Sequence, residues 1–589
     1  MPMKNVFILF SFFLAVAAYG QDEMSTLYQF EVPHKFEHIA YGETDLSTSY
    51  VASSKEITVF QNKDGKVLWN KKFNEITDQI KKVDDLFAVG EAGLIFIFDR
   101  KVGKDKMVCI EEVTGKLLWV SDKFQDVDSQ DNLVFLKDSE EILITTKNDA
   151  SLIRMRTGEL VWRTDKFKGI TADYVLGGDG SIVLINMREA GAVGKFLFGD
   201  FATLAKKAAS GFKNQLVRVN LNTGEVIWEQ AYRGIVEQKL LTRERLVDMK
   251  IKDGKLLLFM KGLHTFDYTT GQPLWSVAYD ETPNEIMNYV KGQVKFGSLG
   301  MAKVQQLGAY GLVADPVIIN GFAYILDVKD KRHQFVKKYD MQTGKMVWQS
   351  PEISDARAIP GLYVTGDKVV IQVGGTVEVQ AIITQSRVGA GLSGNSQGSV
   401  EKAVSGVAEV KPMNVQCFDA TTGKQLWESD KMKKGMTNLY LDNNNVIVCS
   451  GKALYSMDLA SGKENYEVPL KPDNISDASL ILPYNEDVIV VGEKGVSAHN
   501  STTGSLRASS RYKFSTPIRV GGQVVFGTHM ALVTSGSDYA VYDLTSMKYK
   551  NYDARSGASA FFSDDGKSIM IFEEGGLVRK SKITKLGTE

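Results

Sequence analysis

The chain has 589 residues, of which 43% are hydrophobic and 24% are charged, and its formal net charge at pH 7 is −1. This balance leaves enough apolar residue for a large core, and nothing in it predicts a nucleic-acid partner. The three cysteines, Cys109, Cys417 and Cys449, are odd in number and far apart, so a disulfide framework is excluded as the main source of stability. Cys109 and Cys417 lie in strand-like runs and are expected to be small buried hydrophobic residues.

Residues 1–20 have the pattern of a secretory signal peptide. A basic start with Lys4 precedes an apolar run over residues 6–18, and Ala18-Tyr19-Gly20 forms a small-x-small cleavage site. The run is too short to span a bilayer, no later segment predicts a transmembrane helix, and no cysteine stands at the cleavage site as a lipoprotein would require. We expect a soluble exported protein of the periplasm or cell envelope that is not a lipoprotein. The alternative is a buried N-terminal helix or strand.

Seven Gly-x-x-x-Trp motifs divide the rest of the chain into repeated units. Every tryptophan lies four residues after a glycine, and six of these glycines follow a threonine. Alternating strands flank each turn, as at residues 216–220 and 345–348, so each motif predicts a β-hairpin with glycine at the positive φ. Weaker copies follow at Gly462 with Tyr466, at Gly504 and near Thr545-Ser546. The structural motif residues are Gly65, Trp69, Gly115, Trp119, Gly158, Trp162, Gly224, Trp228, Gly271, Trp275, Gly344, Trp348, Gly423 and Trp427.

Two further strands fit between successive turns, and four short strands per unit predict the blade of an all-β propeller. The segments 340–348 and 419–427 follow the pattern Asp-x-x-Thr-Gly-Lys-x-x-Trp. In this pattern the chain resembles the pyrroloquinoline quinone (PQQ) type β-propeller family. The resemblance implies that the tryptophans dock between adjacent blades.

The repeats predict a propeller of eight or more blades over residues 21–589, with ten to eleven blade-like units. Ten turn motifs are followed by strands expected near residues 559–562, 569–572 and 577–583. Residues 27–32 form a lone N-terminal strand, and its pairing with the C-terminal strands would complete one blade and remove exposed edges. This favours one oversized ring over two consecutive propellers.

Three insertions, at about residues 188–214, 280–313 and 376–412, are expected on one face of the ring, opposite the Thr-Gly turns. Long loops on a rigid scaffold commonly carry function, so this face is the candidate partner surface. The first insertion predicts an amphipathic helix that meets a partner or a membrane surface; the alternative is a helix packed over the mouth of the propeller. The insertion at residues 376–412 is rich in Gly, Ser and Ala and is expected to be flexible. The candidate contact residues are Phe201, Leu204 and Phe212 in the insertion at 188–214 and Phe296 and Met301 in the insertion at 280–313.

No constellation of residues predicts catalysis, a cofactor site or a metal site. Residues 389–394 match Gly-x-Gly-x-x-Gly, but they lie in an insertion between β-strands and are expected to form a glycine-rich loop. The six histidines are scattered, and the closest two, His34 and His38, are expected at the surface and not as metal ligands.

The PQQ-type family includes cofactor-dependent dehydrogenases and a non-catalytic branch that resembles the outer-membrane assembly protein BamB. The dehydrogenases typically have adjacent cysteines, which this chain lacks. The resemblance therefore favours a non-enzymatic scaffold without cofactor that binds envelope proteins, with the outer-membrane assembly machinery as one candidate. The alternatives are a PQQ-dependent dehydrogenase-like quinoprotein and a propeller that binds a glycan or small ligand.

Overall fold

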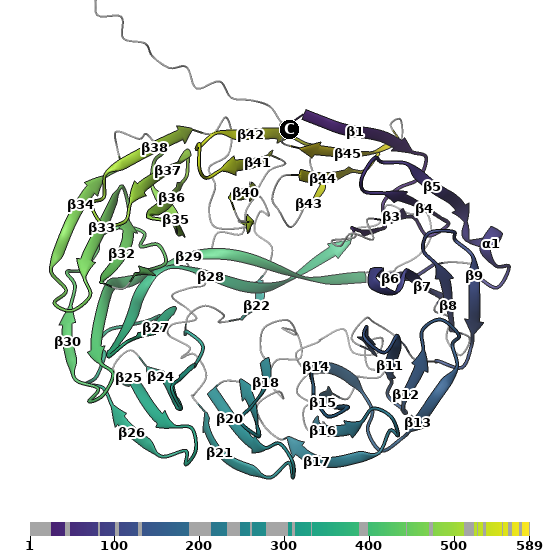
Figure 1. The fold of residues 1–589 in the computed structure, drawn as a ribbon, viewed down its shortest axis with the longest axis horizontal. Helices are drawn as coiled ribbons and strands as arrows, with labels where there is room; N and C mark the ends of the chain where they lie inside the picture. The colour runs from purple at the N-terminus through teal and green to yellow at the C-terminus, as the bar shows by residue number, and fades with distance from the viewer. Residues whose placement is uncertain are drawn as a thin grey trace, which may run out of the picture.

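The computed structural model describes residues 25–41, 48–80, 83–99, 105–125, 127, 132–187, 214–232, 248–259, 262–278, 304–308, 313–330, 333–387, 398–442, 444–470, 475–511, 524–526, 528–533, 538–555, 558–562, 568–575 and 580–587. These residues form eleven antiparallel sheets that stand side by side around a ring (Figure 1). The predicted all-β propeller is confirmed, and its blade number is eleven.

Each blade has four strands that run in order from the centre of the ring to its periphery (Figure 1). Blades one to four contain β2 (His38–Ala40), β3 (Thr48–Ala52), β4 (Glu56–Gln61) and β5 (Val67–Lys72); β6 (Asp85–Val89), β7 (Leu94–Asp99), β8 (Lys106–Glu111) and β9 (Leu117–Ser121); β10 (Leu133–Leu136), β11 (Glu141–Thr145), β12 (Ala150–Arg154) and β13 (Leu160–Thr164); and β14 (Ile170–Leu176), β15 (Ser181–Met187), β16 (Asn214–Asn220) and β17 (Val226–Tyr232).

Blades five to eight contain β18 (Asp248–Lys252), β19 (Lys255–Phe259), β20 (Gly262–Asp267) and β21 (Pro273–Ala278); β23 (Val317–Ile319), β24 (Phe322–Asp330), β25 (His333–Asp340) and β26 (Met346–Gln349); β27 (Gly361–Thr365), β28 (Lys368–Arg387), β29 (Gly398–Asp419) and β30 (Gln425–Glu428), joined by β22 (Val304–Gly308) as a fifth strand; and β31 (Tyr440–Leu441), β32 (Asn445–Ser450), β33 (Ala453–Asp458) and β34 (Glu464–Pro469).

Blades nine to eleven contain β35 (Ala478–Tyr484), β36 (Asp487–Gly492), β37 (Gly495–Asn500) and β38 (Leu506–Arg511); β39 (Val524–Phe526), β40 (His529–Val533), β41 (Asp538–Asp543) and β42 (Tyr549–Asp553); and β43 (Ser559–Phe562), β44 (Ser568–Glu573), β45 (Ser581–Gly587) and β1 (Ser25–Val32). The helical elements of the described chain are α1 (Phe73–Ile76) and a single 3-10 turn over Gly90–Ala92.

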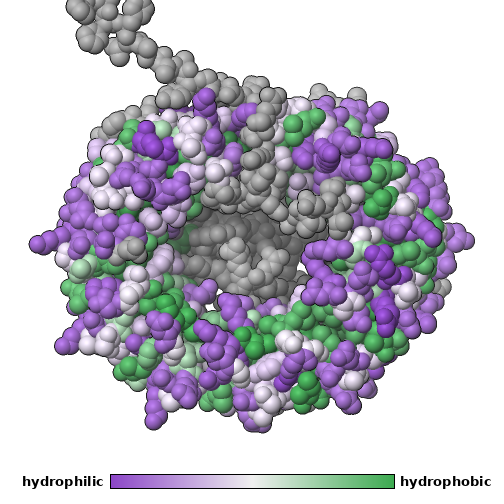
Figure 2. Space-filling view, viewed as in Figure 1, coloured by the Kyte–Doolittle hydropathy of each residue, from purple (hydrophilic) through white to green (hydrophobic). Residues whose placement is uncertain are grey.

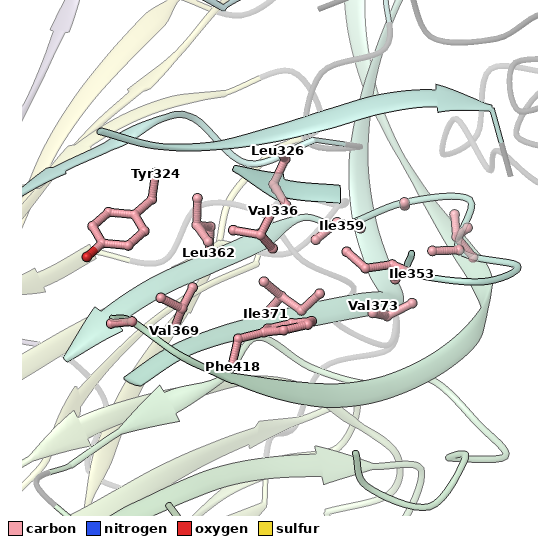
Figure 3. Close-up of a cluster of buried hydrophobic side chains, with 14 of the residues drawn as sticks. Tyr324, Leu326, Val336, Ile353, Ile359, Leu362, Val369, Ile371, Val373 and Phe418 are labelled. Carbon is pink, nitrogen blue, oxygen red and sulfur yellow. The ribbon is translucent and has the colours of Figure 1, made fainter. Parts of the chain in front are cut away.

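The core lies between blades. The second and third strands are buried on both faces, which is why β7 reads as the nearly continuous apolar run Leu-Ile-Phe-Ile-Phe. Within the described residues, each of the eleven joints between neighbouring blades has its own cluster of buried apolar side chains. At the joint of blades six and seven, Tyr324, Leu326 and Val336 pack against Leu362, Ile371 and Phe418 (Figure 3). Burial is thus distributed around the ring instead of being concentrated at one centre.

The first described strand completes the last blade. β1 pairs with β45 in an antiparallel ladder from Ser25 opposite Gly587 to Val32 opposite Ser581. A cluster joins this blade to the first one, since Val51 and Phe60 pack with Met570 and Phe572. The third C-terminal strand was predicted at residues 577–583, but β45 spans Ser581–Gly587. One ring, and not two consecutive propellers, is therefore the architecture.

Candidate functional site

The three predicted insertions leave the ring at one face, which we call the mouth face. Residues 188–213 and the tip 388–397 lie between the second and third strands of blades four and seven, and residues 279–316 join blades five and six. The Thr-Gly turns join third to fourth strands, and in an antiparallel meander such turns lie at the opposite end of the blade. The candidate contact residues Phe201, Leu204, Phe212, Phe296 and Met301, the predicted helix and the 389–394 glycine motif all lie outside the described residues.

Two of the insertions build one β-structure, which we call the arm: residues 374–387 of β28, residues 398–412 of β29, and β22. The prediction that residues 376–412 are flexible is wrong for the described part of this segment. β28 and β29 pair continuously from Gly375 opposite Val410 to Arg387 opposite Gly398, where the described part of the hairpin ends. β22, from the connection between blades five and six, adds antiparallel to β28 at residues 380–383. Figure 1 shows the hairpin running from blade seven across the middle of the ring.

A pair of glycines redirects the chain at the root of the arm. Gly374 and Gly375 have φ values of +66° and +101°, and the β28–β29 register shifts between Val373 and Gly375. A Cβ atom at Gly374 would overlap the carbonyl oxygens of Val410 and Pro412. Only glycine fits both this close backbone approach and the positive φ, so the bulge is a built feature of the arm.

Backbone hydrogen bonds fix the root to the connections on either side of blade seven. The Gly374 amide donates to the Ala358 carbonyl at 2.8 Å, and the Thr376 amide donates to the Met436 carbonyl at 2.9 Å. The buried Gln372 amide group donates to the Gly374 and Thr437 carbonyls, both at 3.1 Å. The arm is thus tied to the flanks of both neighbouring blades before it leaves the ring.

The register of the arm pairs β28 with strands on both sides. Ala381 stands opposite Val404 of β29 and opposite Leu307 of β22. At the root, Val377 and Val410 are buried in the cluster between blades six and seven.

A pocket of about 580 Å³ lies on the innermost strands of blades six to eight. Its lining consists of Val317, Leu362, Tyr363, Val364, Thr365, Tyr440, Leu441 and Asp442. Asp442 accepts hydrogen bonds from the Asn444 and Asn445 amides, so its carboxylate is committed to a turn. Figure 2 shows hydrophilic residues prominent around the outer rim of the ring.

The motif tryptophans and glycines meet in pairs across the joints between blades. A Cβ atom on the glycine of one blade would collide with the indole ring of the preceding blade, and each indole Nε1 donates a hydrogen bond of 2.7–3.3 Å to the carbonyl three residues before that glycine. The pairs are Trp69 with Gly115, Trp119 with Gly158, Trp162 with Gly224, Trp228 with Gly271, Trp275 with Gly344, Trp348 with Gly423, and Trp427 with Gly462. The remaining motif glycine, Gly65, is covered by Tyr28 of β1.

Blades with the weaker motif copies use other residues at the same place. Tyr466 covers Gly504 and donates to the Ser501 carbonyl at 2.9 Å. At the joint of blades nine and ten, the sizes of the two residues are exchanged. The small Ala508 stands at the tryptophan position, and Met547, which is buried and has φ +57°, stands at the glycine position. Arg507 donates to the Leu544 carbonyl at 2.8 Å, where an indole would otherwise donate.

The candidate reactive side chains are committed to the fold. All three cysteines are free and buried, and burial raises the pKa of the Cys109 and Cys417 thiols to about 12. The prediction that His34 lies at the surface is wrong, because it is buried with its Nε2 2.8 Å from Thr58 Oγ1. His38 is half-buried, 3.9 Å from an Asp85 oxygen. Within the described ranges, no three His, Cys, Asp or Glu side chains are grouped as a metal site, and no helix is long and apolar enough to cross a membrane.

A family model described as outer membrane protein assembly factor BamB matches residues 53–181, 148–294 and 411–560, more than half of the chain. No curated protein sequence matches this chain. Among solved structures, the chain is similar to the computationally designed Ika8 protein, with 11% identity over 77% of this chain and 95% of that chain and a TM-score of 0.34. It is similar to BamB from Moraxella catarrhalis, with 12% identity over 83% and 100% of the chains and a TM-score of 0.27. It is also similar to a eukaryotic initiation factor, with 10% identity over 75% and 89% of the chains and a TM-score of 0.31.

Proposed function

The chain belongs to the PQQ-repeat family described as outer membrane protein assembly factor BamB, and on that premise we propose that it is an exported, non-enzymatic scaffold that binds protein partners in the cell envelope. The binding surface in this proposal is the mouth face, where the arm and the two other insertions leave the ring. The outer-membrane assembly machinery is one candidate partner, by the family's description.

The arm is the observation that carries this proposal. A ring of blades needs only short connections to close, yet two insertions combine here into a sheet that is anchored to the blades on both sides of blade seven. Long insertions on a rigid scaffold commonly carry function, so we attribute the length of the arm to contact with something outside the ring. The rigid blades behind it would hold that surface in a fixed orientation.

The cysteine arrangement favours a scaffold over a quinoprotein. Cys109, Cys417 and Cys449 lie in different blades, on β8, β29 and β32, and no two are adjacent in the sequence. The fold alone does not imply the oxidation reaction of the dehydrogenases. A PQQ and calcium titration with an alcohol-oxidation assay tests the alternative directly, and turnover would overturn the non-enzymatic proposal.

An arm-less variant tests the scaffold proposal. Residues 378–407 are replaced by Asn-Gly, which joins Val377 to Ala408 and keeps the root. Full-length wild type and the variant are crosslinked in the native envelope and affinity-purified, and the captured protein is then purified and titrated against both. A partner that binds wild type at least tenfold more tightly than the variant supports the proposal. Equal binding, or no partner above background, contradicts it.

A second variant serves as the matched control for folding and surface change. Thr343→Ala lies in a turn on the opposite face, where the hydroxyl donates to Asp340 Oδ1 and accepts from the Lys345 amide. It is expected to capture the same partner as wild type. Export is tested separately by N-terminal sequencing of the envelope fraction, where a mature start at Gln21 is expected.

The pocket on blades six to eight supports the small-ligand alternative. Tyr363 and Tyr440 present ring surface there beside apolar side chains. Aromatic surface of this kind suits the apolar face of a sugar ring. A glycan array probed with wild type and Tyr440→Ala would decide it, since selective binding lost in the variant favours this alternative.

A further inference from the structure

The connections on the two sides of the arm's root are built alike. Residues 350–360 lead from blade six to blade seven, and residues 429–439 lead from blade seven to blade eight. Each begins with a serine whose amide donates to the carbonyl of a third-strand valine and whose hydroxyl accepts that valine's amide; the pairs are Ser350 with Val336 and Ser429 with Val415. Three residues later, the amide of an apolar residue, Ile353 or Met432, donates to the same strand. The two connections therefore correspond position by position from the serine to this apolar residue.

The exposed residues at the corresponding positions differ in charge. One position lies between the serine and the apolar residue, and two follow directly after the apolar residue. In the connection between blades six and seven, the exposed residues at these positions are Glu352, Ser354 and Asp355. In the connection between blades seven and eight, they are Lys431, Lys433 and Lys434. Because one copy folds with two acids and a serine there, the blade does not require lysine at these positions, and the positive charge needs another explanation.

The lysines are held on a fixed backbone. Met432 packs against the cluster between blades seven and eight, and Ser450 Oγ donates to the Lys434 carbonyl at 2.6 Å. Lys452, two residues after that serine, adds a fourth exposed ammonium group. Among the residues that the structure describes, none forms a hydrogen bond or an ion pair with any of the four lysine side chains. We call the set the basic patch; it consists of Lys431, Lys433, Lys434 and Lys452.

The basic patch adjoins the arm on the mouth face. The Thr376 amide at the arm's root donates to the Met436 carbonyl at 2.9 Å. Gly435 lies beside the same residue, since a Cβ atom at Gly435 would be 3.7 Å from Thr376 Oγ1. A partner that contacts the arm near its root therefore reaches the basic patch as well. Complementary charge on that partner would be acidic, because the connection itself offers one acid, Asp430, against its three lysines.

An acidic protein segment fits this surface better than an anionic membrane does. Glu352 and Asp355 lie at the corresponding place on the other side of the arm's root. A membrane broad enough to cover blade seven would meet these two carboxylates together with the lysines. An extended segment is narrow enough to follow residues 429–439 and avoid the acidic connection.

We propose that the basic patch binds a segment of the partner protein that is rich in aspartate and glutamate, beside the root of the arm. The inference rests on the proposed scaffold function and names the chemistry of the partner's contact. The ammonium groups of the patch meet carboxylates of the segment, so the contact speeds association and weakens as salt is added.

The test measures how tightly the full chain binds a fluorophore-labelled, twelve-residue peptide of alternating glutamate and serine, by fluorescence anisotropy at about 50 mM salt. The patch variant combines Lys431→Gln, Lys433→Gln and Lys434→Gln. It is expected to bind the peptide at least tenfold more weakly than wild type. The matched control removes the same charge from exposed lysines of three turns on the opposite face, and it combines Lys345→Gln, Lys424→Gln and Lys463→Gln. The control is expected to bind as wild type does, and thermal melts check that both variants are folded.

Two outcomes with the peptide and one with lipid overturn the inference. Equal losses in the two variants would show a general effect of net charge, and no binding by wild type would show that the patch does not recognise carboxylates. Vesicles of phosphatidylglycerol and phosphatidylcholine are tested in parallel. If wild type binds these vesicles and the patch variant does not, the occupant is a membrane and not an acidic segment.

The results also separate this inference from the scaffold proposal. If the envelope partner requires the arm but binds the patch variant as tightly as wild type, the scaffold function stands and the acidic contact is wrong. If the peptide binds as expected but no envelope partner is captured, the basic patch stands and the scaffold proposal is contradicted.

Discussion

The indole of Trp69 lies against Gly115 of the next blade, so close that a Cβ atom on Gly115 would be 2.9 Å from Trp69 Cδ2. Its Nε1 donates to the Glu112 carbonyl at 2.8 Å. The glycine therefore serves two purposes: it adopts φ +62° in its own turn and gives the neighbouring ring a flat surface of backbone. These two purposes can be separated experimentally.

We expect Gly115→Ala to destabilise the ring more than Gly93→Ala does. Both glycines have nearly the same positive φ, +62° and +64°, but a Cβ atom at Gly93 meets nothing within 4 Å. Gly93→Ala should cost only the backbone strain, about 1–3 kcal/mol. The additional loss in Gly115→Ala measures the collision with Trp69. Urea unfolding of both variants checks this, and equal losses would contradict the interlocking role of the pair.

Truncation of Trp69 should cost more than removal of its hydrogen bond. Trp69→Ala is expected to lower the unfolding free energy by about 3–5 kcal/mol, as for other buried aromatic residues. Trp69→Phe keeps part of the buried ring and loses the bond to the Glu112 carbonyl, and each such bond contributes about 0.5–1.5 kcal/mol. If Trp69→Ala left thermal stability unchanged, the tryptophans would not hold the blades together.

At the joint of blades nine and ten, the exchanged residues Ala508 and Met547 should be strongly coupled. Ala508→Trp alone would force an indole against the buried Met547 side chain, and such overpacking costs about 1–3 kcal/mol. Met547→Gly alone would leave a cavity. The double variant restores the glycine–tryptophan pair of the other joints and should be more stable than either single variant. A double-mutant cycle measures this, and additive losses would show that the two positions do not share one site.

Asp173 should make the protein less stable as pH rises through about 6. Burial, together with the charge of Asp248, raises the Asp173 pKa to about 6, against the lowering effect of the Tyr174 and Met249 backbone amides. Because the folded-state pKa is raised, this carboxyl contributes stability that is complete below its ordinary pKa near 4 and is lost as pH rises through 6. Asp173→Asn should therefore stabilise the protein at pH 7.5 and have little benefit at pH 4. Thermal melts at both pH values would reveal a contrary trend.

Glu573 should have the opposite pH dependence at the joint of blades ten and eleven. Burial opposes its charge, but hydrogen bonds from Lys582 Nζ and the Arg555 amide, with the positive charges of Lys582 and Arg555, outweigh burial and lower its pKa. The stability it contributes is present above its ordinary pKa and is lost as pH falls through the lowered value. Lys582→Met removes one of the two positive charges beside buried Glu573 and leaves Arg555 Nε at 3.8 Å, so it should cost less than the loss of about 3–5 kcal/mol that follows when a buried charge loses its only partner. Glu573→Gln should flatten the acid limb of the stability profile, and an unchanged limb would exclude this pair as its cause.

The repeat made the ring predictable from the sequence. The Gly-x-x-x-Trp spacing marks the turn and the aromatic residue of successive units, and period-two runs such as residues 216–220 mark their strands, so both follow from local residues. The exchange of Ala508 and Met547 could not be predicted, because it removes both marker residues at once and preserves only the packing between blades. His34 was misjudged because its burial depends on a contact with Thr58 of β4, 24 residues later in the chain, which no local pattern shows.

The arm was missed because its composition conceals its periodicity. Gly, Ser and Ala suggested a flexible loop, although Val377, Val379 and Ile383 keep a period of two that was available in the sequence. The bulge at Gly374 and the pairing of β28 with β22 depend on contacts between distant segments, so no local sequence pattern predicts either feature. The predicted contact residues in the two other insertions remain predictions.

The ladder between β1 and β45 also has a consequence for the order of events in biogenesis. β1 must wait for β45, which is made more than 540 residues later, before the hydrogen bonds between them exist. Until then β1 cannot join blade eleven, Gly65 lacks its Tyr28 cover, and the first blade presents apolar surface to whatever accompanies the nascent chain. The synthesis of β45 thus closes the ring, and a chain interrupted shortly before it would keep nearly all of its blades yet remain an open arc with exposed apolar surface.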